Sequence, residues 1–144
     1  MYKISNCNHN SLWINIGIAG HNKFKPGQLY EIKKVTYVKN NKVFYYSNSL
    51  ISCFEMHEVC SVNKQEKKFK DNYIYDMESF GFIQSVEKIC LRENICILKV
   101  ISDNSDNQPS NYKVFAYNNI KKNMEIINKG LVSYVKENKK DDLD

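Results

Sequence analysis

Apolar residues occur in short runs along the chain, and the spacing of these runs predicts strands and one hairpin. One run covers Leu12 to Ile18 and continues into the small-residue segment Gly17 to Gly20, as expected of a buried strand that enters a tight loop. Two β-rich stretches, Gln28 to Val38 and Lys42 to Ser47, lie on either side of Asn40-Asn41. This arrangement predicts a hairpin.

The middle of the chain alternates between apolar and lysine-rich segments. Leu50 to Phe54 is a further strand candidate, whereas the polar composition between His57 and Asn72 predicts a surface loop or lid. Asp76 is suited to cap a helix, because its carboxylate can accept hydrogen bonds from the free amides of a first turn. The helix is expected to begin at Met77 and to end near Glu93. Its apolar face would consist of Met77, Phe80, Ile83, Val86 and Ile89 or Cys90.

The last third of the chain combines the most strand-like run with the longest helical pattern. Ile95 to Ile101 is nearly continuous in apolar residues, which is typical of a parallel strand covered on both faces. A polar loop from Ser102 to Tyr112 follows, and a second amphipathic helix is expected from about Val114 or Phe115 to Lys136. One stripe of this helix contains Ile120, Met124, Ile127, Leu131 and Val135. Residues 137–144 carry a run of charges and are expected to be a disordered tail.

The order of these elements, strand, hairpin, helix, strand and helix, predicts an α/β protein with a mixed sheet. With 144 residues the chain is long enough for one core, and no linker or internal repeat divides it. We therefore expect a single domain over residues 1–144.

Composition excludes several classes of protein. An apolar share of 42% and a mean hydropathy of −0.55 are ordinary for a water-soluble domain, and the chain shows neither a membrane span nor a signal peptide. The five cysteines form no CxxC pair and are expected to be reduced thiols, as in the cytoplasm. His57 and Cys60 have the spacing of half a metal site, but a second ligand pair is missing, so no metal is expected.

The formal net charge of +5 does not indicate a nucleic-acid partner, because the lysines are scattered among asparagines and acidic residues. Arg92 is the only arginine in the sequence. The chain therefore has little capacity for the planar, bidentate phosphate contacts that arginine makes.

Two acidic residues occupy positions that suit a ligand site. Glu78 lies in the first turn of the first predicted helix, and Asp103 follows the carboxyl end of the central strand, where open α/β sheets bind ligands. Both positions also have structural explanations. Glu78 could simply complement the helix dipole, and Asp103 could form a turn in a Ser-Asp-Asn loop.

The residues around these two carboxylates resemble a known signature. The segment Asp76-Met77-Glu78-Ser79, followed by Val100-Ile101-Ser102-Asp103, is similar to the paired motifs of the nucleoside phosphorylase and nucleosidase superfamily. Upstream, Asn15 to Gly20 with Lys25-Pro26-Gly27-Gln28-Leu29 resembles the family's strand that ends in an Ala-Gly turn and the strand start behind it. The similarity covers about Leu12 to Val135.

The resemblance implies a three-layer αβα fold with a central mixed sheet and cleavage of the bond between a purine base and its sugar, without a cofactor. By resemblance, Asp103 is the catalytic acid that faces the base, and burial should raise its pKa. Ser102 would orient Asp103, while Met77 packs against the sugar and Glu78 accepts hydrogen bonds from sugar hydroxyls. The small residues Ala19 and Gly20 would let the backbone approach the ligand closely.

The chain departs from the family at its beginning. Only a short stretch precedes Leu12, so the family's first βα units are missing, together with the arginine that binds phosphate and the glutamate that activates water. Whether the acceptor is phosphate or water stays open. A complementing N-terminal segment or a homo-oligomer is expected to cover the exposed sheet edge. The alternatives are a binding protein or remnant that retains a purine pocket, and a small interaction domain whose acidic pair is accidental.

Overall fold

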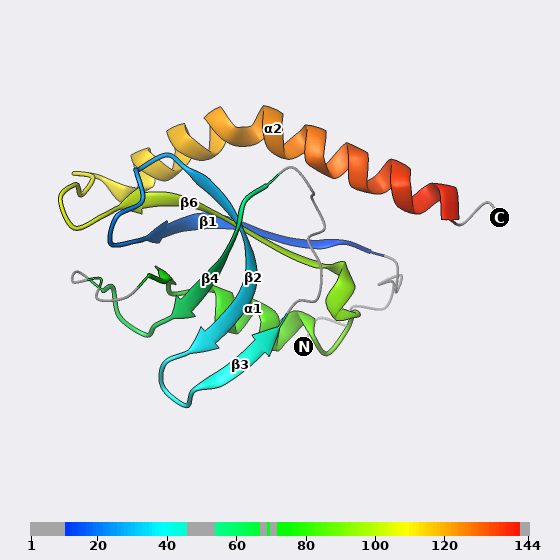
Figure 1. Ribbon diagram of the computed structural model, residues 1–144, viewed down its shortest axis with the longest axis horizontal. Helices are drawn as coiled ribbons and strands as arrows, with labels where there is room; N and C mark the ends of the chain where they lie inside the picture. Colours follow the sequence, from blue (N-terminus) through cyan, green and yellow to red (C-terminus); the bar gives the residue numbers. More distant parts are fainter. Residues whose placement is uncertain (1–10, 46–53, 67–68, 70–71, 142–144) are drawn as a thin grey trace.

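The computed structural model describes residues 11–45, 54–66, 69 and 72–141, and these form a rolled, mixed sheet with a helix on each side (Figure 1). The strands are β1 (Trp13–Gly20), β2 (Leu29–Tyr37), β3 (Lys42–Tyr45), β4 (Met56–Ser61), β5 (Ile74–Asp76) and β6 (Ile95–Asp103). The helices are α1 (Ser79–Val86), the 3₁₀ turn η1 (Arg92–Asn94) and α2 (Tyr112–Asp141).

The sheet is rolled because β2 pairs with two strands, β6 and β4, at different points along its length. The strand order is β3-β2-β4-β5-β1-β6, and the start of β2 also pairs antiparallel with β6, for example Tyr30 with Lys99. Because β2 contacts β4 farther along its length, five strands close into a ring. The predicted α/β class and mixed sheet are confirmed, but the strands do not form the flat middle layer of a simple three-layer stack.

The central pair of strands matches the sequence prediction. β1 and β6 run parallel in register from Trp13 opposite Ile95 to Ala19 opposite Ile101, and every residue of β6 is buried. Alternate residues of β6 face two different cores. Ile97 packs on the side of α1 with Ile83, whereas Leu98 packs on the side of α2 with Ile127.

The predicted hairpin is confirmed as β2 and β3, which pair antiparallel from Lys34 with Tyr45 to Tyr37 with Lys42. Asn41 in the turn has a φ of 53°, the left-handed conformation that asparagine tolerates better than most residues. The strand predicted at Leu50 to Phe54 falls mostly outside the described residues, and Phe54 itself lies in a bend.

The prediction of a surface loop between His57 and Asn72 is wrong for the first part of this segment. β4 occupies Met56–Ser61 and pairs parallel with β2, and β5, also not predicted, pairs parallel with β4. Val59 is buried in the main core. The polar side chains of His57 and Glu58, both only partly buried, obscured this strand in the sequence.

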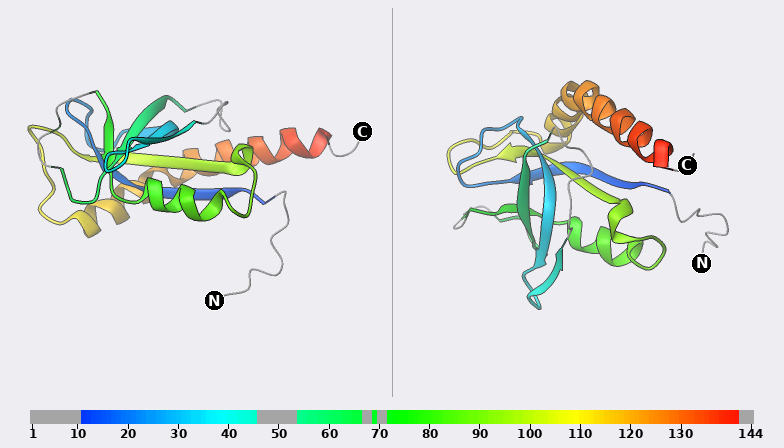
Figure 2. Two further views of the ribbon diagram at one scale, coloured as in Figure 1. Left: turned by 90° about the horizontal axis from the view of Figure 1, so that it is seen from below. Right: turned by 45° about the vertical axis from the view of Figure 1, so that its right-hand side comes forward.

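The helices differ from their predicted bounds. α1 covers only Ser79–Val86, because Met77 and Glu78 form a bend after β5, and the amides of Ile89 and Cys90 turn back to the Val86 carbonyl. α2 is longer than predicted and extends through Asp141, into the expected tail, while residues 142–144 lie outside the description. Its second half runs beyond the sheet (Figures 1 and 2), and Val135 of the predicted buried stripe is exposed.

Candidate functional site

A cavity of about 290 Å³ opens at the carboxyl ends of the parallel strands β1 and β6. It brings together residues from the end of β1, from the bend between β5 and α1, and from the end of β6. All six residues singled out in the sequence line this cavity: Ala19, Gly20, Met77, Glu78, Ser102 and Asp103. The two acidic segments therefore line one concavity, whereas the roles of these residues stay predictions.

Asp103 is the last residue of β6 and is only 4% exposed. Its backbone carbonyl accepts a hydrogen bond of 3.0 Å from the amide of His21, which holds the ends of β1 and β6 together. Burial raises the pKa of the Asp103 carboxyl, and hydrogen bonds from Ser102 and Tyr112 oppose this shift. The expected direction is confirmed, and it favours a carboxyl group that can carry a proton and donate it.

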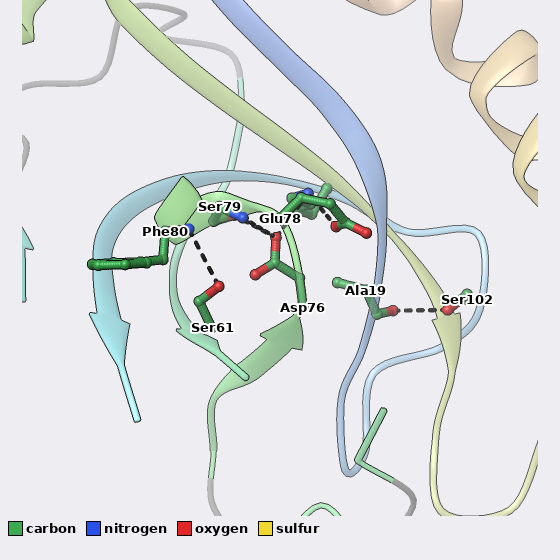
Figure 3. A network of polar contacts seen from close by, with 8 residues as sticks. Ala19, Ser61, Asp76, Glu78, Ser79, Phe80 and Ser102 are labelled. Atoms are coloured by element: carbon green, nitrogen blue, oxygen red, sulfur yellow. Dashed lines mark hydrogen bonds and ion pairs between the residues drawn. The ribbon is translucent and has the colours of Figure 1, made fainter. Parts of the chain in front are cut away.

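Ser102 supplies the hydroxyl group next to this carboxyl. Ser102 Oγ lies 2.5 Å from Asp103 Oδ1. The same oxygen lies 3.2 Å from the carbonyl oxygen of Ala19 (Figure 3). A hydroxyl has one proton but can also accept, so it can donate to an ionised Asp103. When Asp103 is protonated, Ser102 can instead accept from it and donate to Ala19. The site thus accommodates both protonation states without leaving the hydroxyl unpaired.

Met77 and Glu78 lie in the bend that joins β5 to α1. Met77 is 52% exposed, and the Glu78 side chain is 63% exposed, so both are accessible to a molecule in the cavity. Glu78 precedes the first residue of α1 and does not lie in its first turn as predicted. Its Oε2 atom is 3.5 Å from Nζ of Lys99, which orients a carboxylate that is otherwise solvated.

A buried ion pair lies behind Glu78, and sequence reasoning missed it. Lys99 Nζ is 2.8 Å from Asp76 Oδ2, and the two side chains are 1% and 0% exposed. Asp76 was predicted to cap a helix, and its Oδ2 atom does accept from the amide of Ser79 at 3.0 Å and from the Ser79 hydroxyl (Figure 3). The same carboxylate therefore fixes the start of α1 and holds the lysine that contacts Glu78.

Gly17 on β1 makes room for the lysine. A Cβ atom at this position would lie 2.9 Å from Lys99 Nζ, closer than Cβ atoms approach other atoms in proteins. In the sequence, the sign of this contact is Lys99, the one charged residue inside the apolar ICILKVI run. In the sheet, Lys99 lies opposite Gly17 of the neighbouring strand β1. A buried lysine needs a partner, so the pair Gly17 and Lys99 indicates a nearby carboxylate.

Gly20 was expected to let a ligand approach the backbone, but an aromatic ring occupies that position. A Cβ atom at Gly20 would lie 2.3 Å from Cζ of Phe69, so the ring packs directly on the glycine. Phe69 is 6% exposed and lines the cavity together with Tyr75. The small residue is thus explained by packing of Phe69.

The remaining sequence expectations concern metals and phosphate. Among the residues that the structure describes, no group of three or more His, Cys, Asp or Glu side chains could hold a metal ion. Arg92 lies in η1, where it forms an exposed ion pair with Glu87 at 2.8 Å and does not line the cavity. No helix in the described part of the chain is long and apolar enough to cross a membrane.

The sequence matches no protein-family model and no curated protein. Solved structures with a similar fold include nucleosidases. The 5′-methylthioadenosine/S-adenosyl homocysteine nucleosidase (MTAN) of Campylobacter jejuni has a TM-score of 0.66 at 11% identity, over 84% of this chain and 69% of that protein. A selenomethionine form of the Chlamydia trachomatis MTAN has a TM-score of 0.64 at 22% identity, over 86% of this chain and 65% of that one.

The Chlamydia trachomatis MTAN has also been solved with adenine. This complex aligns with a TM-score of 0.58 at 23% identity, over 76% of this chain and 55% of that protein. In these two alignments the chain spans 55% and 65% of the length of that nucleosidase. These proteins are members of the nucleoside phosphorylase and nucleosidase superfamily, so the resemblance read from the sequence is confirmed at the level of the fold.

Proposed function

We propose that the chain binds a purine base or purine nucleoside in the cavity beside Asp103 and provides the leaving-group side of N-glycosidic bond cleavage. The observation that carries this proposal is the convergence of Met77, Glu78, Ser102 and Asp103 on one cavity at the carboxyl ends of parallel strands. The fold supports it, because structures of similar fold are nucleosidases and one of them was solved with adenine.

The proposed chemistry follows from the needs of the leaving base. A purine leaves as an anion unless an acid protonates it or donates a hydrogen bond to its imidazole ring. A protonated Asp103, with Ser102 ready to donate as the carboxylate forms, supplies that donor. Glu78, oriented by Lys99, accepts hydrogen bonds from sugar hydroxyls, and Met77 packs against the sugar.

Binding by the purified chain is the direct test. At about 100 times its dissociation constant, adenine should add about 2.7 kcal/mol to the unfolding free energy, and each kcal/mol corresponds to roughly 2–4 °C for a domain of this size. Melting temperatures should therefore rise with adenine or a thio-substituted adenine nucleoside. Asp103→Asn should reduce this rise, whereas Asp106→Asn, at an exposed carboxylate in the loop that follows β6, should not. Equal stabilisation of both variants would contradict the assignment of Asp103.

We further propose that catalysis needs a second polypeptide segment or another copy of the chain. Over Trp13–Ala19, β1 pairs with β6 along one edge, and in the described part of the chain its other edge meets only β5, at Gly20. Two side-chain atoms of this strand, Trp13 Nε1 and Asn15 Oδ1, are buried and have no hydrogen-bond partner among the residues that the structure describes. An unpaired edge of this kind is a site for strand addition.

The proposal of a second segment predicts how activity should respond. The lone chain should release base slowly, because general acid catalysis contributes only about 10² to 10⁴-fold. Adding the βα units of a related nucleosidase, fused ahead of Leu12 or supplied separately, should increase base release, and Asp103→Asn should abolish the increase. Light scattering of the lone chain distinguishes a second copy from a separate segment as the covering partner. The five cysteines, which form no CxxC pair, support a reducing compartment such as the cytoplasm.

A further inference from the structure

The corner that follows β1, residues 21–24, is organised around the side chain of His21. His21 is 0% exposed, and its Nδ1 atom lies 3.0 Å from the backbone nitrogens of both Lys23 and Phe24. Its other ring nitrogen, Nε2, lies 3.0 Å from Oδ1 of Asn72, in the segment that leads into β5. One imidazole ring thus closes the corner and joins it to a segment 51 residues away.

These contacts determine the protonation state of the ring. A backbone N–H can only donate, so Nδ1 has to accept from Lys23 and Phe24 and cannot itself carry a hydrogen. The hydrogen of a neutral imidazole then lies on Nε2, which donates it to Asn72 Oδ1. A second proton, on Nδ1, would point at two N–H groups and break both hydrogen bonds. The folded corner therefore accommodates His21 only as the neutral Nε2–H tautomer.

Aromatic rings enclose His21. The ring of Phe24 stacks on the imidazole with the two centroids 3.5 Å apart, and the ring of His57 on β4 meets it edge-on at 5.5 Å. A cation on the face of Phe24 would gain some attraction, but the loss of two hydrogen bonds and the removal of the charge from water oppose this gain. Burial accordingly lowers the pKa of His21, and the hydrogen bond to Asn72 offsets this shift only in part.

The charged groups near the ring act in the same direction as burial. His57 on β4 and Lys23 in the corner itself both lower the pKa of His21, because each disfavours a second positive charge beside it. From β2, Tyr30 stacks on the far side of Phe24 at 4.5 Å. Burial and the charge of Glu55 raise the pKa of Tyr30, so its phenol is neutral and supplies no negative charge.

The loop that follows β6 is attached to this corner. Three hydrogen bonds connect them: the His21 amide donates to the Asp103 carbonyl at 3.0 Å, the Ser105 amide to the Asn22 carbonyl at 3.3 Å, and the Asn104 side-chain amide to the Phe24 carbonyl at 3.0 Å. Asp103 meets His21 through its backbone, whereas its carboxyl group bonds to Ser102 at the cavity. The corner thus supports the part of the cavity wall that contains Asp103.

We propose that His21 is an acid-sensitive latch: as a neutral imidazole it holds the corner after β1 against the end of β6, and a second proton on the ring releases the corner and loosens the cavity wall at Asp103. The proton comes from solvent, which reaches Nδ1 when the corner opens. The latch acts on the cavity whatever molecule binds there, so this inference does not rest on the proposed function.

Two variants each keep one end of the ring. His21→Asn retains an acceptor near the place of Nδ1, so it can still bind the two backbone amides, and it does not titrate. His21→Gln retains a donor near the place of Nε2 but loses that acceptor. We therefore expect His21→Asn to be the more stable of the two in urea denaturation at neutral pH. Equal stability, or the reverse order, would contradict the assignment of Nδ1 as the acceptor.

The response to acid follows from the direction of the pKa shift. The unfolded chain takes up the second proton at a pKa of about 6.5, and the folded chain binds this proton less tightly. The folding equilibrium constant of the parent, divided by that of His21→Asn, should therefore be constant at higher pH and decrease below about pH 6.5, by up to about tenfold per pH unit. Groups that titrate alike in both proteins cancel in this ratio. His57→Gln removes the neighbouring imidazole and keeps the latch, so it should show the same decrease.

Two NMR measurements on the parent complete the test. Long-range ¹H–¹⁵N spectra of the His21 ring should show a hydrogen on Nε2 and none on Nδ1 at neutral pH. Hydrogen exchange, referenced to an unstructured chain at the same pH, should show that the amides of His21 and Phe24 lose protection in mild acid while Leu98 in β6 stays protected. A hydrogen on Nδ1, a stability ratio that does not change with pH, or an equal loss of protection at Leu98 would overturn the inference.

Discussion

Replacing Lys99 with methionine removes the cation of the buried ion pair while keeping a long, unbranched side chain. Asp76 then remains as a fully buried carboxylate, because its side chain is 0% exposed in the parent. Removing one partner of a buried pair typically costs 3–5 kcal/mol. Asp76 keeps the hydrogen bonds from the Ser79 amide and hydroxyl, so we expect a value near the lower end, about 3 kcal/mol.

Urea denaturation measures this loss. With a slope of about 2 kcal/mol per molar urea, a loss of about 3 kcal/mol lowers the midpoint by about 1.5 M. Lys129→Met provides the matched control, because Lys129 and Glu125 form an exposed pair on α2 at 3.2 Å. Such pairs contribute about 0.3–0.5 kcal/mol, so the control midpoint should hardly move.

A double variant tests the cause of the loss. In Lys99→Met with Asp76→Asn, the buried charge is gone and the amide oxygen can still accept from Ser79, so part of the lost stability should return. If Lys99→Met were as stable as the parent, or if the double variant were less stable than the single one, the pair would not be the buried, charge-compensating unit described above.

Two further predictions concern the cavity. Because burial raises the pKa of Asp103, the folded state binds its proton more tightly than the unfolded chain, and this contribution to stability is lost as pH rises from about 4 through the folded-state pKa. Asp103→Asn has no carboxyl group to titrate, so its unfolding free energy relative to that of the parent, measured by urea denaturation, should rise between pH 3 and pH 7. A relative unfolding free energy that stays constant over this range would contradict the raised pKa of Asp103. Gly20→Ala should cost about 1–3 kcal/mol, because its Cβ would lie 2.3 Å from Phe69 Cζ. Gly81→Ala in α1, where a Cβ meets no atom within 4 Å, should instead stabilise by about 0.5–1 kcal/mol, and melting temperatures that moved in the same direction for both would refute this packing argument.

Elements with a strong local pattern could be predicted from the sequence. The β2–β3 hairpin follows from its turn residues, β6 from its apolar run, and α2 from its helical stripe. The site residues could be placed together because the end of a parallel strand and the start of a helix converge in α/β folds, and the resemblance supplied the motifs.

Features that depend on distant partners could not be predicted. β4 has polar residues at His57 and Glu58 and is a strand because β2 pairs with it, not because of its own pattern. Lys99 looked like an interruption of an apolar run, since the carboxylates that bind it lie on other elements. Tyr112 belongs to the site through the way α2 enters the fold, which no local spacing encodes.

The parallel pairing of β1 and β6 also has a consequence for how the chain folds. Ser102 and Ala19, joined by a hydrogen bond in the site, are 83 residues apart in the sequence, and the intervening chain contributes β2, β4, β5 and α1. Closing so long a loop costs entropy before the contacts form, so refolding should be slow, in the millisecond to second range of proteins rich in non-local pairing. Since the cavity forms only when both strand ends have met, a ligand that recognises it should mainly slow unfolding and should hardly accelerate folding.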